Sequence, residues 1–202
     1  PGGRLVLFAS GWVYNTPVWS SDGSVSNEVK EPATGIALPR RLAFNGNQLT
    51  LLGVGVRQKA IAVVSVNVYA VGLYLPQQSA AKALSRFSGA VPGALAGDAS
   101  YYSALSALPQ KYLHLIFARA VAAHKRFTSL LLTAVGAVGP RQGQSISLGA
   151  DGGTMVVLSD GKFIGEVKDA ALAAAVFDLY VGKEPVSPAA KEAFASGLGG
   201  FL

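Results

Sequence analysis

One arginine lies inside a long apolar stretch of the chain, and its chemistry suits a carboxylate. Arg57 follows Gly53-Val54-Gly55-Val56 and precedes a Val- and Tyr-rich stretch that carries Tyr69. A guanidinium stays protonated and presents five N–H donors in a planar fork, which fits a carboxylate in an apolar cavity. The Tyr69 hydroxyl adds another donor. Because the two residues are an even number of positions apart, a regular strand path places both on one face of a sheet. On composition alone, the alternative is that Arg57 extends to solvent from a sheet edge and that Tyr69 packs with its hydroxyl at the surface.

Other kinds of chemistry find little support in the sequence. There is no cysteine, which excludes disulfides, thiolate metal sites and thiol catalysis. The two histidines, His114 and His124, fall in different predicted elements, so no metal and no cofactor is expected. His114 is interpreted as a core or surface histidine, with haem ligation by either histidine as the minor alternative. No G-x-S-x-G or phosphate-binding glycine motif occurs, which leaves hydrolase and nucleotide-binding functions without support.

Composition indicates one domain with much apolar surface to cover. Half of the 202 residues are hydrophobic and only 14% are charged, against roughly 25% in an average soluble chain. We therefore expect an enclosed apolar cavity, a large partner interface or proximity to a membrane. The apolar run Ala60–Leu75 is interrupted by Ser65 and Asn67, so no transmembrane segment is predicted. The net charge of +6 favours an anionic lipid or an acidic partner, and the scattered basic residues predict no nucleic-acid binding.

The first half of the chain predicts the start of a sheet. Asn45-Gly46 between apolar segments is a strong hairpin signal, because both residues tolerate positive φ. From Val54 to Leu75 the residue types favour strands, and the polar pair Gln58-Lys59 predicts a break into two strands or a bend. Alternation then places Ser65, Asn67 and Tyr69 on one face and Val64, Val66 and Val68 on the other.

The second half predicts further strands and helices. Three strands separated by Gly-containing turns indicate an antiparallel meander, and Ser187-Pro188 is typical of a helix N-terminus. The predicted elements are a helix over Ser79–Phe87 capped by Ser79, a strand over Tyr112–Ala118, a helix of about four turns through Phe127 and Leu130, strands over Ser145–Leu148, Thr154–Leu158 and Lys162–Val167, and helices over Leu172–Val181 and from Pro188. This order implies an α+β domain with an antiparallel β-sheet packed against a layer of helices, an open-faced β-sandwich.

Three motifs, in this order, resemble those of the chalcone isomerase superfamily. They are Leu52-Gly53-Val54-Gly55-Val56-Arg57, then Val68-Tyr69-Ala70-Val71-Gly72-Leu73-Tyr74-Leu75, and last Phe177-Asp178-Leu179-Tyr180-Val181-Gly182 with Val186-Ser187-Pro188 after it. The resemblance covers residues 31–202 and implies one domain with the chalcone isomerase fold. Residues 1–30 fall outside it and are expected to form an irregular N-terminal arm.

The resemblance implies a lost isomerase site. Members that catalyse use an arginine, a threonine, a tyrosine, an asparagine and a later serine or threonine. Arg57 matches the arginine, Tyr69 stands at the threonine position, and Arg126, Thr133 and Leu179 fall near the other three. Because cyclisation of a chalcone needs several positioned donors, this set implies that the protein is not an enzyme.

The pair of Arg57 and Tyr69 resembles the fatty-acid-binding branch of the superfamily. That branch implies that Arg57 and Tyr69 bind the carboxylate of a fatty acid, while the cleft between sheet and helices holds its tail. Possible tail-lining residues are Phe127, Leu130, Val176 and Phe177. The branch also implies a plastid (chloroplast stroma) location, with the mitochondrion as the alternative.

We therefore expect noncatalytic binding of a fatty acid or a similar acyl carboxylate. Three other interpretations stay open. The chain could be an accessory subunit of a larger organellar complex that docks through the aromatic arm Leu5–Trp19, it could retain residual chalcone isomerase activity, or it could bind haem through a propionate.

Overall fold

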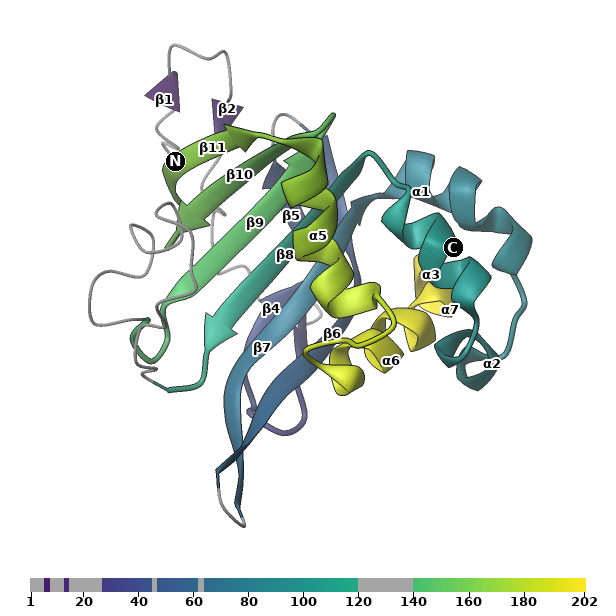
Figure 1. Cartoon of the computed structure of the whole chain (residues 1–202), viewed down its shortest axis with the longest axis horizontal. Coiled ribbons are helices and arrows are strands. Elements are labelled where there is room, and N and C mark those ends of the chain that lie inside the picture. Colours follow the sequence, from purple (N-terminus) through teal and green to yellow (C-terminus); the bar gives the residue numbers. More distant parts are fainter. Residues whose placement is uncertain (1–5, 8–12, 15–26, 45–46, 62–63, 120–139) are drawn as a thin grey trace.

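The computed structural model describes residues 6–7, 13–14, 27–44, 47–61, 64–119 and 140–202. Its main feature is a seven-stranded antiparallel sheet in the order β11-β10-β9-β8-β7-β6-β5, with helices on one face (Figure 1). The strands are β1 (Val6–Leu7), β2 (Val13–Tyr14), β3 (Glu28–Lys30), β4 (Ala37–Pro39), β5 (Arg41–Phe44), β6 (Asn47–Ile61), β7 (Val64–Pro76), β8 (Gln110–Phe117), β9 (Ser145–Asp151), β10 (Thr154–Ser159) and β11 (Lys162–Lys168). The described helices are α1 (Gln77–Leu84), the 3-10 helix η1 (Ser85–Phe87), α2 (Pro92–Ala96), α3 (Ala99–Ser106), α5 (Ala170–Val181), α6 (Pro188–Ser196) and α7 (Leu198–Phe201). The predicted α+β class and helix-on-sheet architecture are confirmed.

Every neighbouring pair of strands in this sheet is also consecutive along the chain. The pairing of Phe44 with Asn47 leaves two residues for the connection between β5 and β6, which confirms the hairpin at Asn45-Gly46. The meander β9–β10–β11 is confirmed as well. Because only consecutive strands pair, the register of each strand is set by its neighbour in sequence.

The stretch from Val54 to Leu75 forms two strands, as predicted, but the first strand ends later than the predicted break near Gln58-Lys59. Strand β6 continues through these residues to Ile61, and β7 begins at Val64. Gln58, Lys59 and Ala60 are exposed, and this end of β6 pairs only with β7. Polar side chains therefore reach solvent without interrupting the strand.

The predicted alternation along β7 is wrong at one point. Arg57 pairs with Tyr69 but Gln58 pairs with Asn67, so Val68 is an extra residue on β7 and forms a β-bulge. Val68 and Tyr69 consequently pack in the same hydrophobic core instead of on opposite faces. From Tyr69 onward the alternation is regular.

Two hydrophobic cores lie on the two faces of the sheet. The helix-side core includes Val71, Leu73, Leu75, Leu113, Phe177 and Phe194. The back core lies under the β3–β4 hairpin and includes Leu38, Leu42, Phe44, Tyr74, Tyr112 and Val156. Helix α5 crosses the front of the central strands and α6 lies against β6, so the helix side is where a ligand cleft was predicted (Figure 1).

The two helix N-termini that the sequence predicted to be capped by a serine differ in outcome. Ser187 caps α6 by accepting from the Ala190 N–H at 3.1 Å, with Pro188 as the first helical residue, as predicted. Ser79 does not cap α1, because that helix begins two residues earlier, directly after Pro76 at the end of β7. Within the described ranges, no helix is both long and apolar enough to cross a membrane.

Candidate functional site

Arg57 and Tyr69 lie directly opposite each other on β6 and β7. Their Cα atoms are partners in the strand register, so their side chains share the helix-side face of the sheet. Tyr69 is 9% exposed and Arg57 is half-buried. Phe117 of β8 is the next residue in the same row, and its ring packs edge-on against that of Tyr69 with centroids 5.4 Å apart. The structure thus brings the two predicted carboxylate-binding residues together, and whether they bind a ligand stays a prediction.

Helix α5 adds a residue that the sequence analysis missed. The Tyr180 hydroxyl lies 2.9 Å from the Tyr69 hydroxyl, and both are buried. The sequence placed Tyr180 on the apolar face of its helix, three residues after Phe177, where it read as ordinary core. That position already predicted that Tyr180 faces the sheet, but only the fold shows which strand residue it meets.

Burial keeps both phenols neutral. Removal from water raises the pKa of Tyr69, and the hydrogen bond from Tyr180 and the positive charge of Arg57 offset this rise in part. Burial, together with the neighbouring Tyr69, raises the pKa of Tyr180 well above its ordinary value. Two neutral hydroxyls beside a guanidinium offer hydrogen-bond donors and one positive charge.

Arg57 is held from the side of the C-terminal helices. Its Nη1 donates to the carbonyl oxygen of Val186 in the α5–α6 connection. The next residue, Ser187, donates its hydroxyl to the Val56 carbonyl at 2.7 Å while it caps α6. In the described part of the chain, no carboxylate oxygen lies within 4.0 Å of a guanidinium nitrogen of Arg57. The ion pair found there joins Arg141 and Asp160 instead. The guanidinium therefore has donors left for an external anion.

Two glycines allow α6 to approach β6 this closely. A Cβ on Gly53 would lie 2.3 Å from the Ala193 carbonyl oxygen, and one on Gly55 would lie 2.4 Å from the Ala190 Cα. Helix α6 therefore packs directly on the strand backbone. The two glycines of Gly53-Val54-Gly55 make this close contact possible because they have no Cβ. The contact also brings Val186, which precedes α6, within hydrogen-bonding distance of Arg57.

The predicted tail-lining residues are only partly described. Phe177 is 2% exposed in the helix-side core, and Val176 is half-buried against that core. Phe127 and Leu130 lie outside the described residues, as do Arg126, Thr133 and His124. Two cavities formed by described residues, of about 180 and 350 Å³, lie elsewhere and do not include Arg57 or Tyr69.

Two other ionisable residues, one buried and one half-buried, have internal partners. Lys111 is 7% exposed and donates to the carbonyls of Ser106 and Leu108, while its Nζ lies 5.3 Å above the Phe177 ring. His114 lies on the back face, with its Nδ1 2.8 Å from the Ser147 hydroxyl, and burial lowers its pKa to about 4. Both contacts indicate structural roles. In the described ranges, no group of three His, Cys, Asp or Glu side chains is arranged to hold a metal ion.

Comparisons with known proteins agree with the fold and the resemblance. A family model described as chalcone isomerase-like matches residues 30–91. Fatty-acid-binding protein 1 of Arabidopsis thaliana is 26% identical over 207 residues, which cover 87% of this chain and 72% of that protein. The crystal structure of an Arabidopsis thaliana fatty-acid-binding protein matches with a TM-score of 0.66 and 22% identity, over 86% of this chain and 98% of that chain. The predicted resemblance to the fatty-acid-binding branch and the predicted chalcone isomerase fold are confirmed.

Proposed function

We propose that this chain, a chalcone isomerase-like protein in its fold, binds a fatty acid or similar acyl carboxylate without catalysing a reaction. The observation that carries the proposal is the row formed by Arg57 and Tyr69 on the helix-side face of the sheet. A half-buried guanidinium that lacks a carboxylate partner in the described residues sits beside a buried neutral hydroxyl. The name of the Arabidopsis protein, which matches this chain both in sequence and in its crystal structure, supports the same ligand class.

The head group binds through two kinds of donor. Arg57 uses N–H groups other than the one bonded to Val186, and Tyr69 donates its hydroxyl hydrogen. The Tyr69 and Tyr180 hydroxyls are hydrogen-bonded to each other, and when Tyr180 is the donor the Tyr69 hydrogen is free for the carboxylate and Tyr69 is strengthened as a donor. The acyl tail runs in an apolar cleft between sheet and helices, against Val176 and Phe177 and the predicted residues Phe127 and Leu130.

The absence of catalysis is proposed from the donors at the site. Tyr69 is buried and neutral at the position that resembles the catalytic threonine. Leu179, at the position of the later hydroxyl, is 50% exposed and has no polar side-chain atom. An arginine and a tyrosine hold a carboxylate, but an enolate that develops elsewhere on a substrate would need further placed donors.

The test is ligand retention by Arg57 variants. Arg57→Ala should weaken the binding of a long-chain fatty acid about 10- to 150-fold, since a hydrogen bond to a charged group contributes about 1.5–3 kcal/mol. Arg57→Gln keeps a donor for the Val186 carbonyl, so it separates loss of the ligand from loss of that internal bond. Arg41→Ala, an exposed arginine on β5, is the matched control.

Native mass spectrometry with denaturing lipid analysis of the purified variants gives the readout. A fatty acid that co-purifies with the wild type and with Arg41→Ala, but not with either Arg57 variant, supports the proposal. Equal retention by a folded Arg57→Gln protein contradicts it.

We also propose a plastid stroma as the location, with the mitochondrion as the alternative. The support is the resemblance to the fatty-acid-binding branch. Imaging of the full-length protein fused to a fluorescent protein at its C-terminus tests this location, and a cytosolic signal contradicts it.

A further inference from the structure

A groove of about 350 Å³ lies where the β3–β4 hairpin meets the ends of β7 and β8. Strand β4 lies behind the sheet, on the face opposite α5 (Figure 1). The volume of the groove falls within the range of about 300–1,000 Å³ that is usual for small-molecule sites. The described residues that matter for its chemistry are Ile36, Asn67, Ile116, Phe117, Arg119 and Gln142.

Two polar side chains of the groove are available to a ligand. Arg119 and Gln142 are exposed, and neither forms a hydrogen bond or an ion pair with another residue of the described ranges. Asn67 is engaged instead, because it donates to the Ala33 carbonyl at 2.8 Å and accepts from Gln58 at 2.9 Å. The groove therefore offers one guanidinium and one amide.

The acidic residue of the β3–β4 turn does not compete for this guanidinium. Glu31 is 3% exposed, and its carboxylate accepts from the backbone N–H groups of Ala33 and Thr34 and from the Thr34 hydroxyl. Its charge is thus compensated inside the turn. Arg119 keeps its donors for an external anion.

The rest of the lining is largely apolar. Ile36 and Ile116 pack against the back core, and Phe117 is 8% exposed in the helix-side core. A bare inorganic anion would leave this apolar lining uncovered. A guanidinium beside such a lining suits an anion that carries a short apolar body.

We propose that this groove is a second ligand site, in which Arg119 binds a small amphipathic carboxylate against the apolar lining. The inference goes beyond the proposed function, because it uses neither Arg57 nor Tyr69. The two sites nevertheless adjoin. Phe117 lines the groove, and its ring also packs against that of Tyr69 with centroids 5.4 Å apart.

NMR titration of the lipid-free full chain with 4-phenylbutyrate tests the site, with neutral 4-phenylbutanamide as the matched ligand. We expect the carboxylate to bind more tightly and to shift the amide signals of Gln142 and Gly143. Arg119→Gln should weaken carboxylate binding about fivefold, the upper range for an exposed charged pair, and leave amide binding unchanged. Ala33→Phe adds a ring to an exposed lining residue without a change of charge, so it should abolish the binding of both ligands.

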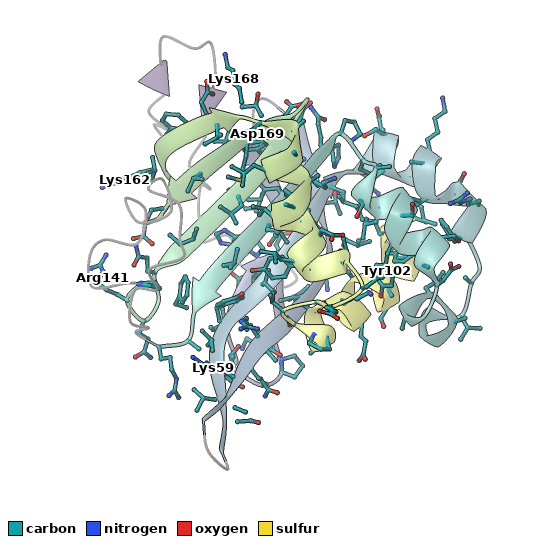
Figure 2. All side chains as sticks on the ribbon, viewed as in Figure 1. Lys59, Tyr102, Arg141, Lys162, Lys168 and Asp169 are labelled. Carbon is teal, nitrogen blue, oxygen red and sulfur yellow. The ribbon has the colours of Figure 1, made fainter. Side chains whose placement is uncertain are left out.

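Arg141→Gln is the matched control. It removes the same charge beside the groove, but Arg141 is not among the lining residues and pairs with Asp160 at 3.7 Å. Figure 2 shows Arg141 near the end of the sheet where β9 begins. A loss confined to Arg119→Gln and Ala33→Phe supports the inference. Equal losses in Arg119→Gln and Arg141→Gln, equal binding of the two ligands, or no binding by the wild type overturn it.

The outcome is separable from that of the proposed function. Arg57→Gln should lose a long-chain fatty acid and still bind 4-phenylbutyrate in the groove. Loss of 4-phenylbutyrate in Arg57→Gln but not in Arg119→Gln would place this ligand at the acyl site and overturn the inference. Binding in the groove together with an absence of any retained fatty acid would uphold the second site and refute the pair of Arg57 and Tyr69.

Discussion

Gly55→Ala should separate α6 from β6 and lower the stability of the whole domain. The new methyl group would lie 2.4 Å from the Ala190 Cα and 2.7 Å from its nitrogen. Both are backbone atoms, so no side-chain rotation relieves the overlap. Because ordinary contacts begin near 3.4 Å, the helix must move by about 1 Å.

The cost can be worked out from the contacts that this movement breaks. Overpacking a well-packed contact costs about 1–3 kcal/mol. The movement also stretches the hydrogen bond from Ser187 to Val56, which contributes about 1 kcal/mol. We therefore expect the free energy of unfolding to fall by about 2–4 kcal/mol, out of a total of about 5–15 kcal/mol for a typical domain.

Urea unfolding followed by far-UV circular dichroism measures this change. Gly93→Ala is the matched control, since Gly93 lies in α2 and a Cβ there would meet nothing within 4 Å. That variant should be stabilised by up to about 1 kcal/mol through its helix propensity. If Gly55→Ala unfolds within about 0.5 kcal/mol of the wild type, the close approach of α6 to β6 is refuted.

Two further predictions concern the buried hydroxyls and the back-face histidine. Tyr69→Phe and Tyr180→Phe should each lower the free energy of unfolding by about 1–2 kcal/mol, because each leaves the other hydroxyl buried without its partner. The double variant should lose less than the sum in urea unfolding, and strict additivity would speak against the pair. For His114, burial keeps the pKa at about 4 in the folded state against 6.5 in the unfolded chain. Below pH 6.5 the unfolded state therefore binds a proton that the folded state does not, so the wild type should lose about 3 kcal/mol more than His114→Gln between pH 7 and 4. If the free energies of unfolding of the two proteins change equally with pH across this range, the lowered pKa of His114 is ruled out.

Features that depend on neighbouring residues were predictable from the sequence. The hairpin at Asn45-Gly46, the meander from Ser145 to Lys168 and the cap at Ser187-Pro188 follow from turn and capping chemistry that acts over a few residues. The architecture followed from the order of these elements and from the resemblance.

Features that depend on contacts between distant segments were not predictable in this way. The bulge at Val68 shifts the register of β7, which an alternation count cannot detect. The polarity of Gln58-Lys59 indicated a break at that point, whereas these side chains face solvent and β6 continues to Ile61. Tyr180 read as core because its partner Tyr69 lies on a strand more than a hundred residues away.

For the carboxylate site, the sequence supplied the residue types and the structure supplied the reason for their proximity. Even spacing placed Arg57 and Tyr69 on one face, but they are cross-strand neighbours and not members of one strand. Two hydrogen bonds, from Arg57 to the Val186 carbonyl and from Ser187 to the Val56 carbonyl, depend on the position of α6 against β6. No local sequence pattern predicts that position.

The contact between Gly55 and Ala190 also affects how the chain folds during synthesis. Strand β6 is synthesised before α6, and more than a hundred residues separate the two elements. Until α6 arrives, the glycine-lined surface of β6 has no cover and the guanidinium of Arg57 has no carbonyl partner. Contacts of such long sequence separation form late and slowly. This surface therefore stays exposed to aggregation until α6 has been synthesised, and molecular chaperones should engage the chain during that interval.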